Sequence, residues 1–141
     1  MKTEQLTREA LTAYAAENRE AFEALLKDFV EIPSVSVDPT KKNAIRENAK
    51  LAADVIRRFG GASRILETDG HPIVAGAWGK NPLWPTVTVY NHLDVQPASM
   101  ETEPWKTEPF TFTKQGDRYF GRGTTDDKGP VVTDDARQLF R

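Results

Sequence analysis

The stretch Val87-Thr-Val-Tyr-Asn-His92-Leu-Asp94-Val-Gln-Pro97, with its downstream partner Gly121-Arg-Gly-Thr-Thr-Asp126-Asp127-Lys-Gly129-Pro130, organises the rest of this chain. In the first segment, a β-branched run leads into a histidine and, two residues later, an aspartate. The period of two in an extended chain places both side chains on the same side. A ring nitrogen of His92 is then available to a metal ion, and Asp94 is close enough to orient the ring.

The second segment places a pair of aspartates between glycines at positions 121, 123 and 129. Glycine occurs where a chain turns tightly or where another group approaches its backbone, so this turn presents Asp126 as a hard carboxylate ligand. Together, His92, Asp94 and Asp126 predict a zinc-type site. The competing interpretation is a core histidine paired with a nearby acid.

Other kinds of site fit the glycine-rich segment less well. A phosphate loop has glycine directly before its lysine, whereas Lys128 follows Asp127, and a dinucleotide fingerprint would need glycine in place of Asp126. A calcium loop would need alternating oxygen ligands and a closing glutamate, which are missing. The serine-hydrolase motif Gly-x-Ser-x-Gly is absent as well.

Composition limits the class of protein further. The length of 141 residues suits one domain, and 19 basic against 21 acidic residues give a net charge of -2 without a basic run, which argues against a nucleic-acid partner. With no cysteine, any metal must be held by nitrogen and oxygen, as suits a reducing compartment. No apolar stretch approaches the length of a membrane span, so we expect a cytoplasmic protein without membrane contact.

The flanking sequence alternates helical and extended patterns. Helices are expected at Thr7–Glu31 and Lys42–Phe59, with a short one from Thr133. Strands are expected at Ala62–Thr68 and Pro72–Trp78, joined by a turn at Asp69-Gly70, then at Thr86–Tyr90, Phe110–Thr113 and Arg118–Phe120.

The two motifs, with Trp105, Pro109-Phe110 and the upstream segment Ile32-Pro33-Ser34-Val-Ser36, resemble the M20 metallopeptidases in their carnosinase-like dipeptidase branch. The His-x-Asp and Gly-Arg-Gly-x-x-Asp-x-Lys-Gly elements occur in the family's order. The resemblance implies an α/β fold, with helices packed on a mixed β-sheet, in which the chain is the N-terminal portion of a zinc-peptidase-like catalytic domain. It further implies a dipeptide or small peptide-like substrate, and it is compatible with a homodimer of the full-length parent.

The resemblance also implies roles for single residues. His92 would ligate one zinc ion, Asp126 would bridge two, and Asp94 would orient His92 and support its basicity. Two zinc ions about 3.5 to 4 Å apart can share a hydroxide that attacks a peptide carbonyl. Asp127 and Lys128 match the motif, and we expect them to be structural.

Several family elements have no counterpart here. The family's general base and further ligands come from a Glu-Glu pair, another acid and a distant histidine, whereas this sequence has no Glu-Glu pair and no glutamate after Glu108. We therefore expect an incomplete catalytic domain over residues 1–141, without the family's smaller inserted domain and C-terminal half, and inactive alone. The alternative is a noncatalytic metal-binding or interaction module derived from this fold.

Overall fold

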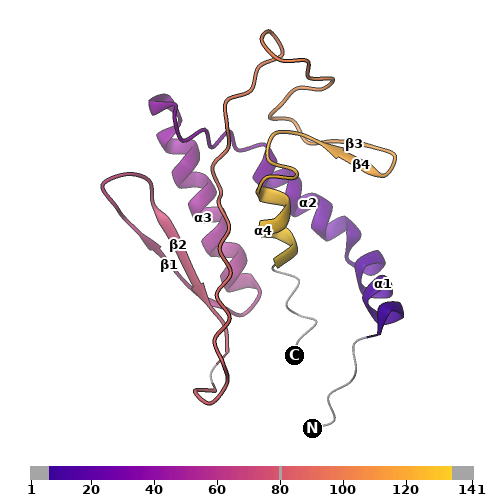
Figure 1. The fold of residues 1–141 in the computed structure, drawn as a ribbon, viewed down its shortest axis with the longest axis vertical. Helices are drawn as coiled ribbons and strands as arrows, with labels where there is room; N and C mark the ends of the chain where they lie inside the picture. The colour runs from indigo at the N-terminus through magenta and orange to yellow at the C-terminus, as the bar shows by residue number, and fades with distance from the viewer. Residues whose placement is uncertain (1–6, 80, 135–141) are drawn as a thin grey trace.

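The computed structural model describes residues 7–79 and 81–134. The elements follow one another as α1 (Arg8–Glu17), α2 (Arg19–Val30), the 3-10 helix η1 (Pro39–Lys41), α3 (Lys42–Arg58), β1 (Ala62–Leu66), β2 (Ile73–Ala77), β3 (Thr113–Gln115), β4 (Arg118–Phe120) and α4 (Lys128–Asp134). Figure 1 shows α3 with the β1–β2 hairpin on one side, and α2, α4 and the β3–β4 hairpin on the other. Between them runs the long irregular segment that leads into His92.

The predicted N-terminal helix is confirmed, but it forms as two helices that meet at Asn18. The side-chain hydroxyl of Thr7 caps α1 by accepting a hydrogen bond from the Ala10 amide. The side-chain amide of Asn18 donates to the Tyr14 carbonyl, which is the local competition with the helix ladder that asparagine offers. Helix α1 buries no residue, whereas α2 buries four: Leu25, Leu26, Phe29 and Val30.

Helix α3 and the β1–β2 hairpin that follows it in the chain agree closely with the prediction. The strands β1 and β2 are antiparallel, paired from Ala62 opposite Ala77 to Leu66 opposite Ile73. A methyl group at Gly76 would lie 2.7 Å from the Ile56 side chain, so glycine lets α3 pack closely on β2. Helix α3 therefore provides a fixed support for the residues that hold the His92 segment.

Helix α4 begins five residues earlier than the predicted start at Thr133. Proline lacks only its own N–H, which has no intrahelical partner in a first turn, so Pro130 does not end this helix. The buried side chain of Val132 packs on the α2 core, and Lys128 reaches the end of α2. These long-range contacts set the start of α4. Asp135, expected in its first turn, lies outside the described residues.

The strand predicted at Thr86–Tyr90 does not form, which corrects the sequence interpretation. Val87 is 78% exposed and Tyr90 is 85% exposed, and no strand is assigned to the described residues between β2 and β3. A strand needs a neighbour for its backbone groups, and a hollow of about 740 Å³ separates this segment from β2. The β-branched side chains alone do not supply that neighbour.

The α/β fold class is confirmed by helices packed with small sheets. Among the described residues the sheets are the antiparallel pairs β1–β2 and β3–β4, and one isolated parallel bridge joins Val35 to Val95, so the expected mixed sheet does not form in this part of the chain. The β3–β4 pair was expected, although β3 starts where the predicted strand was to end. No helix in the described part of the chain is long and apolar enough to cross a membrane.

Candidate metal centre

The His92 segment is held by an upstream segment, Ser34–Val35, which follows α2. The Val95 amide donates to the Ser34 carbonyl at 3.0 Å, next to the parallel bridge between Val35 and Val95. This pairing lays the serine-rich turn after α2 along the His-x-Asp motif. The motif is therefore fixed at its C-terminal end, although residues 86–90 are exposed.

The carbonyl group between His92 and Asp94 is fixed by two buried side chains. The Leu93 oxygen accepts hydrogen bonds from Ser34 Oγ at 2.7 Å and from Asn48 Nδ2 at 2.9 Å, and Asn48 also donates to Ser34 Oγ. Ser34 is 1% exposed and Asn48 is fully buried. Because buried polar groups are costly to leave unpaired, this network fixes the orientation of the peptide that carries both motif residues.

The glycine turn brings Asp126 to His92. Gly123 has a φ of 94°, and a methyl group there would lie 3.0 Å from both Val95 Cγ1 and Lys128 Cδ. At Gly129, an added methyl would lie 2.1 Å from the Thr124 carbonyl oxygen. Both positions favour glycine, because the turn packs directly against its own continuation and against the His92 segment.

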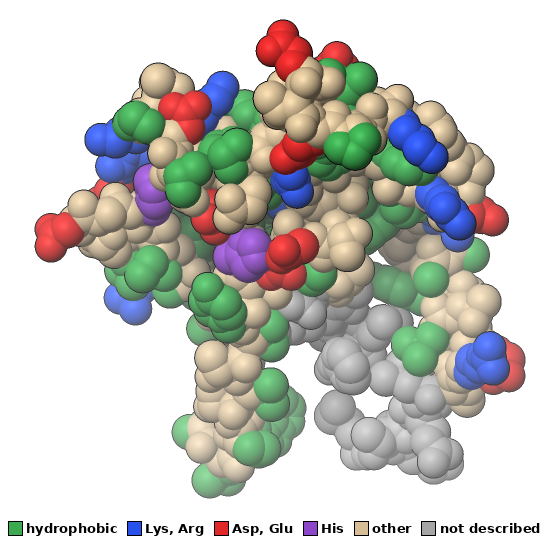
Figure 2. Space-filling model, turned by 45° about the horizontal axis from the view of Figure 1, so that its top comes forward, with side chains coloured by type: hydrophobic (Ala, Val, Ile, Leu, Met, Phe, Trp, Pro, Cys, Tyr) green, Lys and Arg blue, Asp and Glu red, His purple; other side chains and the backbone are tan. Residues whose placement is uncertain are grey.

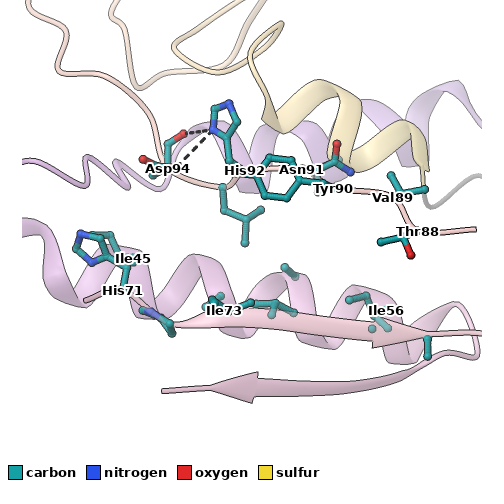
Figure 3. Close-up of a pocket in the computed structure, with 18 of the residues that line it drawn as sticks. Ile45, Ile56, His71, Ile73, Thr88, Val89, Tyr90, Asn91, His92 and Asp94 are labelled. Atoms are coloured by element: carbon teal, nitrogen blue, oxygen red, sulfur yellow. Dashed lines mark hydrogen bonds and ion pairs between the residues drawn. The ribbon is translucent and has the colours of Figure 1, made fainter. Parts of the chain in front are cut away.

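The His92 ring contacts both predicted partners, and Figure 3 shows the contacts with Asp94. Its Nδ1 lies 3.0 Å from the Asp94 carbonyl oxygen and 3.4 Å from Asp94 Oδ1, and its Nε2 lies 2.9 Å from Asp126 Oδ1. The structure thus brings together all three predicted site residues. Figure 2 shows a histidine side chain against acidic side chains in the middle of one face. The ring is 36% exposed and the Asp126 side chain 85% exposed, so the site is open to solvent.

The protonation of His92 follows from these contacts. Partial burial is the largest single influence and lowers the pKa of His92, but the Asp94 carbonyl, the Asp126 carboxylate and the charges of both acids together raise it. The tautomer of the neutral ring decides which contact is a hydrogen bond: with the proton on Nδ1, the ring donates to the Asp94 carbonyl oxygen and leaves a lone pair on Nε2. That lone pair points at another acceptor, Asp126 Oδ1, so a cation or a second proton belongs between them.

The neighbouring motif residues Asp127 and Lys128 make structural contacts. Asp127 Oδ2 accepts the His92 amide hydrogen at 3.1 Å, directly after a cis Asp126–Asp127 peptide bond. Lys128 is fully buried, and its Nζ donates to the Phe29 and Ile32 carbonyls, each at 2.7 Å. Burial lowers the pKa of Lys128 to about 7, and the charge of Asp94 opposes that effect.

The pair of donor atoms suits a zinc ion in kind and in spacing. Imidazole nitrogen and carboxylate oxygen are common zinc ligands, and bonds of about 2.0–2.2 Å in a tetrahedral site place two ligand atoms roughly 3.3 Å apart. The 2.9 Å between His92 Nε2 and Asp126 Oδ1 differs from that spacing by a few tenths of an ångström. Residues 7–79 and 81–134 contain no group of three or more His, Cys, Asp or Glu able to hold a metal ion.

The hollow beside the site is mainly apolar. Its volume is about 740 Å³, and Figure 3 shows Ile45, Ile56 and Ile73 on one side, with His92 and Asp94 near one end. His71 lies near the same end, where its Nε2 is 3.0 Å from the Ser36 carbonyl oxygen. His71 thus contacts backbone and stays apart from the His92–Asp126 pair.

The sequence interpretation missed three residues that support the site: Ser34, Ser36 and Asn48. One signal in the sequence was available. Ser34 and Ser36 are two residues apart in an extended segment, which is the same spacing as His92 and Asp94 in the segment they contact. For Asn48 no such signal exists, because an asparagine in the middle of a helix reveals its partner only in the folded chain.

The chain resembles known proteins in sequence and in fold. The family described as "Peptidase family M20/M25/M40" matches residues 88–133, which include both motifs. The chain is 39% identical over 125 residues to the Cys-Gly metallodipeptidase dug1 of Schizosaccharomyces pombe, covering 81% of this chain and 26% of that protein. It is 36% identical over 137 residues to the Beta-Ala-His dipeptidase of Mus musculus, covering 88% of this chain and 28% of that protein.

The fold also resembles solved structures. The crystal structure of human carnosine dipeptidase 1 superposes with a TM-score of 0.78 at 30% sequence identity, over 92% of this chain and 31% of that one. The chain therefore spans about a quarter of the length of the curated relatives it matches.

Proposed function

Because the chain belongs to the M20 peptidases and corresponds to the N-terminal part of its dipeptidase relatives, we propose that it carries the first residues of a zinc dipeptidase site. The observation that supports this most strongly is the 2.9 Å separation of His92 Nε2 and Asp126 Oδ1, which belong to the two motifs. The proposed parent reaction is metal-assisted hydrolysis of a dipeptide or a related small amide.

Four residues have defined parts in this proposal: His92, Asp94, Asp126 and Asp127. His92 and Asp126 would hold the metal, with Asp126 bridging two zinc ions. When bound, zinc would act as a Lewis acid and provide a hydroxide at neutral pH. Asp94 keeps the Nδ1 proton of His92 in place, so that Nε2 presents its lone pair. The Asp127 carboxylate fixes the His92 backbone by accepting a hydrogen bond from the His92 amide.

The relatives support the proposed substrate class. The fungal relative is a Cys-Gly metallodipeptidase and the mouse relative a Beta-Ala-His dipeptidase. We assign a dipeptide or small peptide-like substrate to the parent activity. We further propose that the longer protein acts in the cytoplasm and that it forms a homodimer. The apolar hollow beside His92 is wide enough for a small molecule.

The isolated chain is proposed to bind metal weakly and to be catalytically inactive. A catalytic zinc ordinarily has three protein ligands and a water, and His92 with Asp126 provides two. A second candidate function is a noncatalytic metal-binding or interaction module; its interaction form needs no three-ligand group, and residues 7–79 and 81–134 contain none. A well-folded chain with a defined protein partner and no exposed apolar surface would support the module.

Zinc binding by the purified chain tests the proposal. We expect competition with a chromophoric chelator to give a measurable affinity in the parent chain and none above background for His92→Ala and Asp126→Asn. Asp117→Asn, which changes an exposed aspartate in the β3–β4 turn, is the matched control and should bind as the parent does. Equal zinc affinity in the parent and Asp126→Asn would refute the ligand assignment.

Hydrolysis is tested separately. Cys-Gly and β-Ala-His are incubated with the zinc-loaded chain, and free amino acids are measured. We expect no turnover by the chain alone. Metal-dependent hydrolysis that His92→Ala abolishes would contradict the proposed inactivity while supporting the proposed site.

A further inference from the structure

The side chain of Ser36 contacts the carboxylate that orients His92. Its Oγ donates to Asp94 Oδ2 at 2.6 Å, across 58 residues of sequence. A hydroxyl hydrogen bond to an ionised carboxylate is short and about twice as strong as one between neutral groups. The contact is therefore suited to holding Asp94 in one orientation.

Asp94 needs such a contact to keep a defined orientation. Its side chain is 47% exposed, and the terminal torsion of an aspartate is broad. With Oδ2 held by Ser36, Oδ1 faces His92 Nδ1 at 3.4 Å. The carboxylate and its own backbone carbonyl then both face the same ring nitrogen.

The Ser36 hydroxyl is not required to attach this segment to the rest of the molecule. Ser34 binds the Leu93 carbonyl, and the backbone pairing between Val35 and Val95 fixes the register. The Ser36 carbonyl has its own contact with His71 Nε2. Removal of the Ser36 hydroxyl should therefore leave the segment in place and release the Asp94 carboxylate.

We infer that Ser36 is a positioning residue of this site: its hydroxyl fixes the Asp94 carboxylate so that the His92 proton stays on Nδ1 and the Nε2 lone pair faces Asp126. The orientation of Asp94 is a property of the chain itself. Its consequence for metal affinity rests on the proposed function.

The tautomer of His92 gives a readout that needs no metal. Nitrogen NMR of the metal-free chain, at a pH where both histidine rings are neutral, measures the ratio of Nδ1–H to Nε2–H at each ring. In Ser36→Ala we expect this ratio to fall about threefold at His92, the size that the loss of one supporting hydrogen bond implies. Ser36→Thr, which keeps the hydroxyl, should restore the parent ratio.

His71 is the internal control, because it contacts the Ser36 backbone and not its side chain. An unchanged His71 spectrum in Ser36→Ala, with a changed His92 ratio, supports the inference. If the His92 ratio is unchanged, or if both histidines shift together, Ser36 has no role or a merely structural one, and the inference is overturned. Ser63→Ala removes a hydroxyl that donates to the Ala53 carbonyl, and it should change neither ring.

Zinc affinity provides the second readout. Groups that support a metal ligand typically change metal affinity by about 10–100-fold, and Ser36 acts one contact further out, so Ser36→Ala should weaken zinc binding by roughly threefold to tenfold. A parent chain that binds no zinc, with the tautomer shift present, refutes the proposed metal site and leaves the positioning role supported. Zinc binding without a tautomer shift refutes the positioning role alone.

Discussion

His92 Nε2 lies 2.9 Å from Asp126 Oδ1, although 34 residues separate the two in sequence. The other ring nitrogen, Nδ1, also faces an oxygen, so one of the two contacts pairs two acceptors unless the ring carries a second proton. The contact between His92 and Asp126 connects the two motifs, and most of the structural features described above either orient the ring or position the carboxylate. The predictions below test those features separately.

The pKa of His92 should fall in Asp126→Asn. Partial burial lowers this pKa and the two acids raise it, so loss of one acid shifts the balance towards burial. NMR titration of the His92 ring in the metal-free chain measures the change. Asp117→Asn should leave the titration unchanged, and an equal shift in both variants would show a general effect of net charge.

The stability that Lys128 contributes should rise with pH above about 7. Its folded pKa of about 7 lies below the value of about 10.4 in an unfolded chain, so between these values the unfolded state binds more protons. Urea unfolding of the parent and Lys128→Met at several pH values should show the parent gaining relative to the variant, by at most about 1.4 kcal/mol per pH unit. Lys114→Met, which removes a half-exposed lysine paired with Glu23, is the control for loss of a lysine that is not buried. A flat Lys128 difference would mean that the two carbonyls keep its pKa high.

Asn48→Ala should destabilise the chain by about 1–3 kcal/mol, because it leaves the buried Ser34 and Leu93 groups short of a partner. Urea unfolding measures the loss. Asn43→Ala, on the exposed face of the same helix, should stay within about 0.5 kcal/mol of the parent. Equal effects of the two substitutions would show that helix propensity, and not the buried network, determines the result.

Gly123→Ala should cost more than Gly116→Ala. Both glycines have positive φ, 94° and 59°, but an added methyl meets Val95 and Lys128 at Gly123 and nothing within 4 Å at Gly116. The conformational cost is about 1–2 kcal/mol at either position, and crowding at Gly123 adds about 1–3 kcal/mol. Thermal or urea unfolding gives both values. A cost at Gly116 that matches or exceeds the cost at Gly123 would contradict the close packing described for this turn.

The segment before His92 should bind a hydrophobic dye. Leu83 is 89% exposed and Val87 is 78% exposed, and Figure 2 shows hydrophobic side chains along an arm that projects from the molecule. We expect dye fluorescence to rise on addition of the folded chain and to drop in the double variant Leu83→Ser, Val87→Ser. Leu11→Ser, an exposed position on α1, is the control and should keep most of the signal. No fluorescence from the parent would favour the interaction module, whose apolar surface is covered.

The local elements could largely be predicted, because their causes are local. The apolar face of Lys42–Phe59 and the stop at Gly60-Gly61 specify α3 almost to the residue, and the turn at Asp69-Gly70 specifies the first hairpin. The Thr86–Tyr90 segment has the same β-branched signal and forms no strand. What it lacks is a neighbouring strand, and no residue within the segment reveals that.

By itself, the sequence determined the motif spacings, the residue types able to bind a metal and the resemblance that relates the chain to the M20 peptidases, because these depend on residue order alone. Tertiary structure decided the rest. It placed Asp126 beside His92 through a glycine turn that packs against Val95, and it placed the Ser36 hydroxyl on Asp94 across 58 residues. Such contacts form only when distant segments pack together, since the free energy that fixes them comes from burial and pairing of groups that the chain separates.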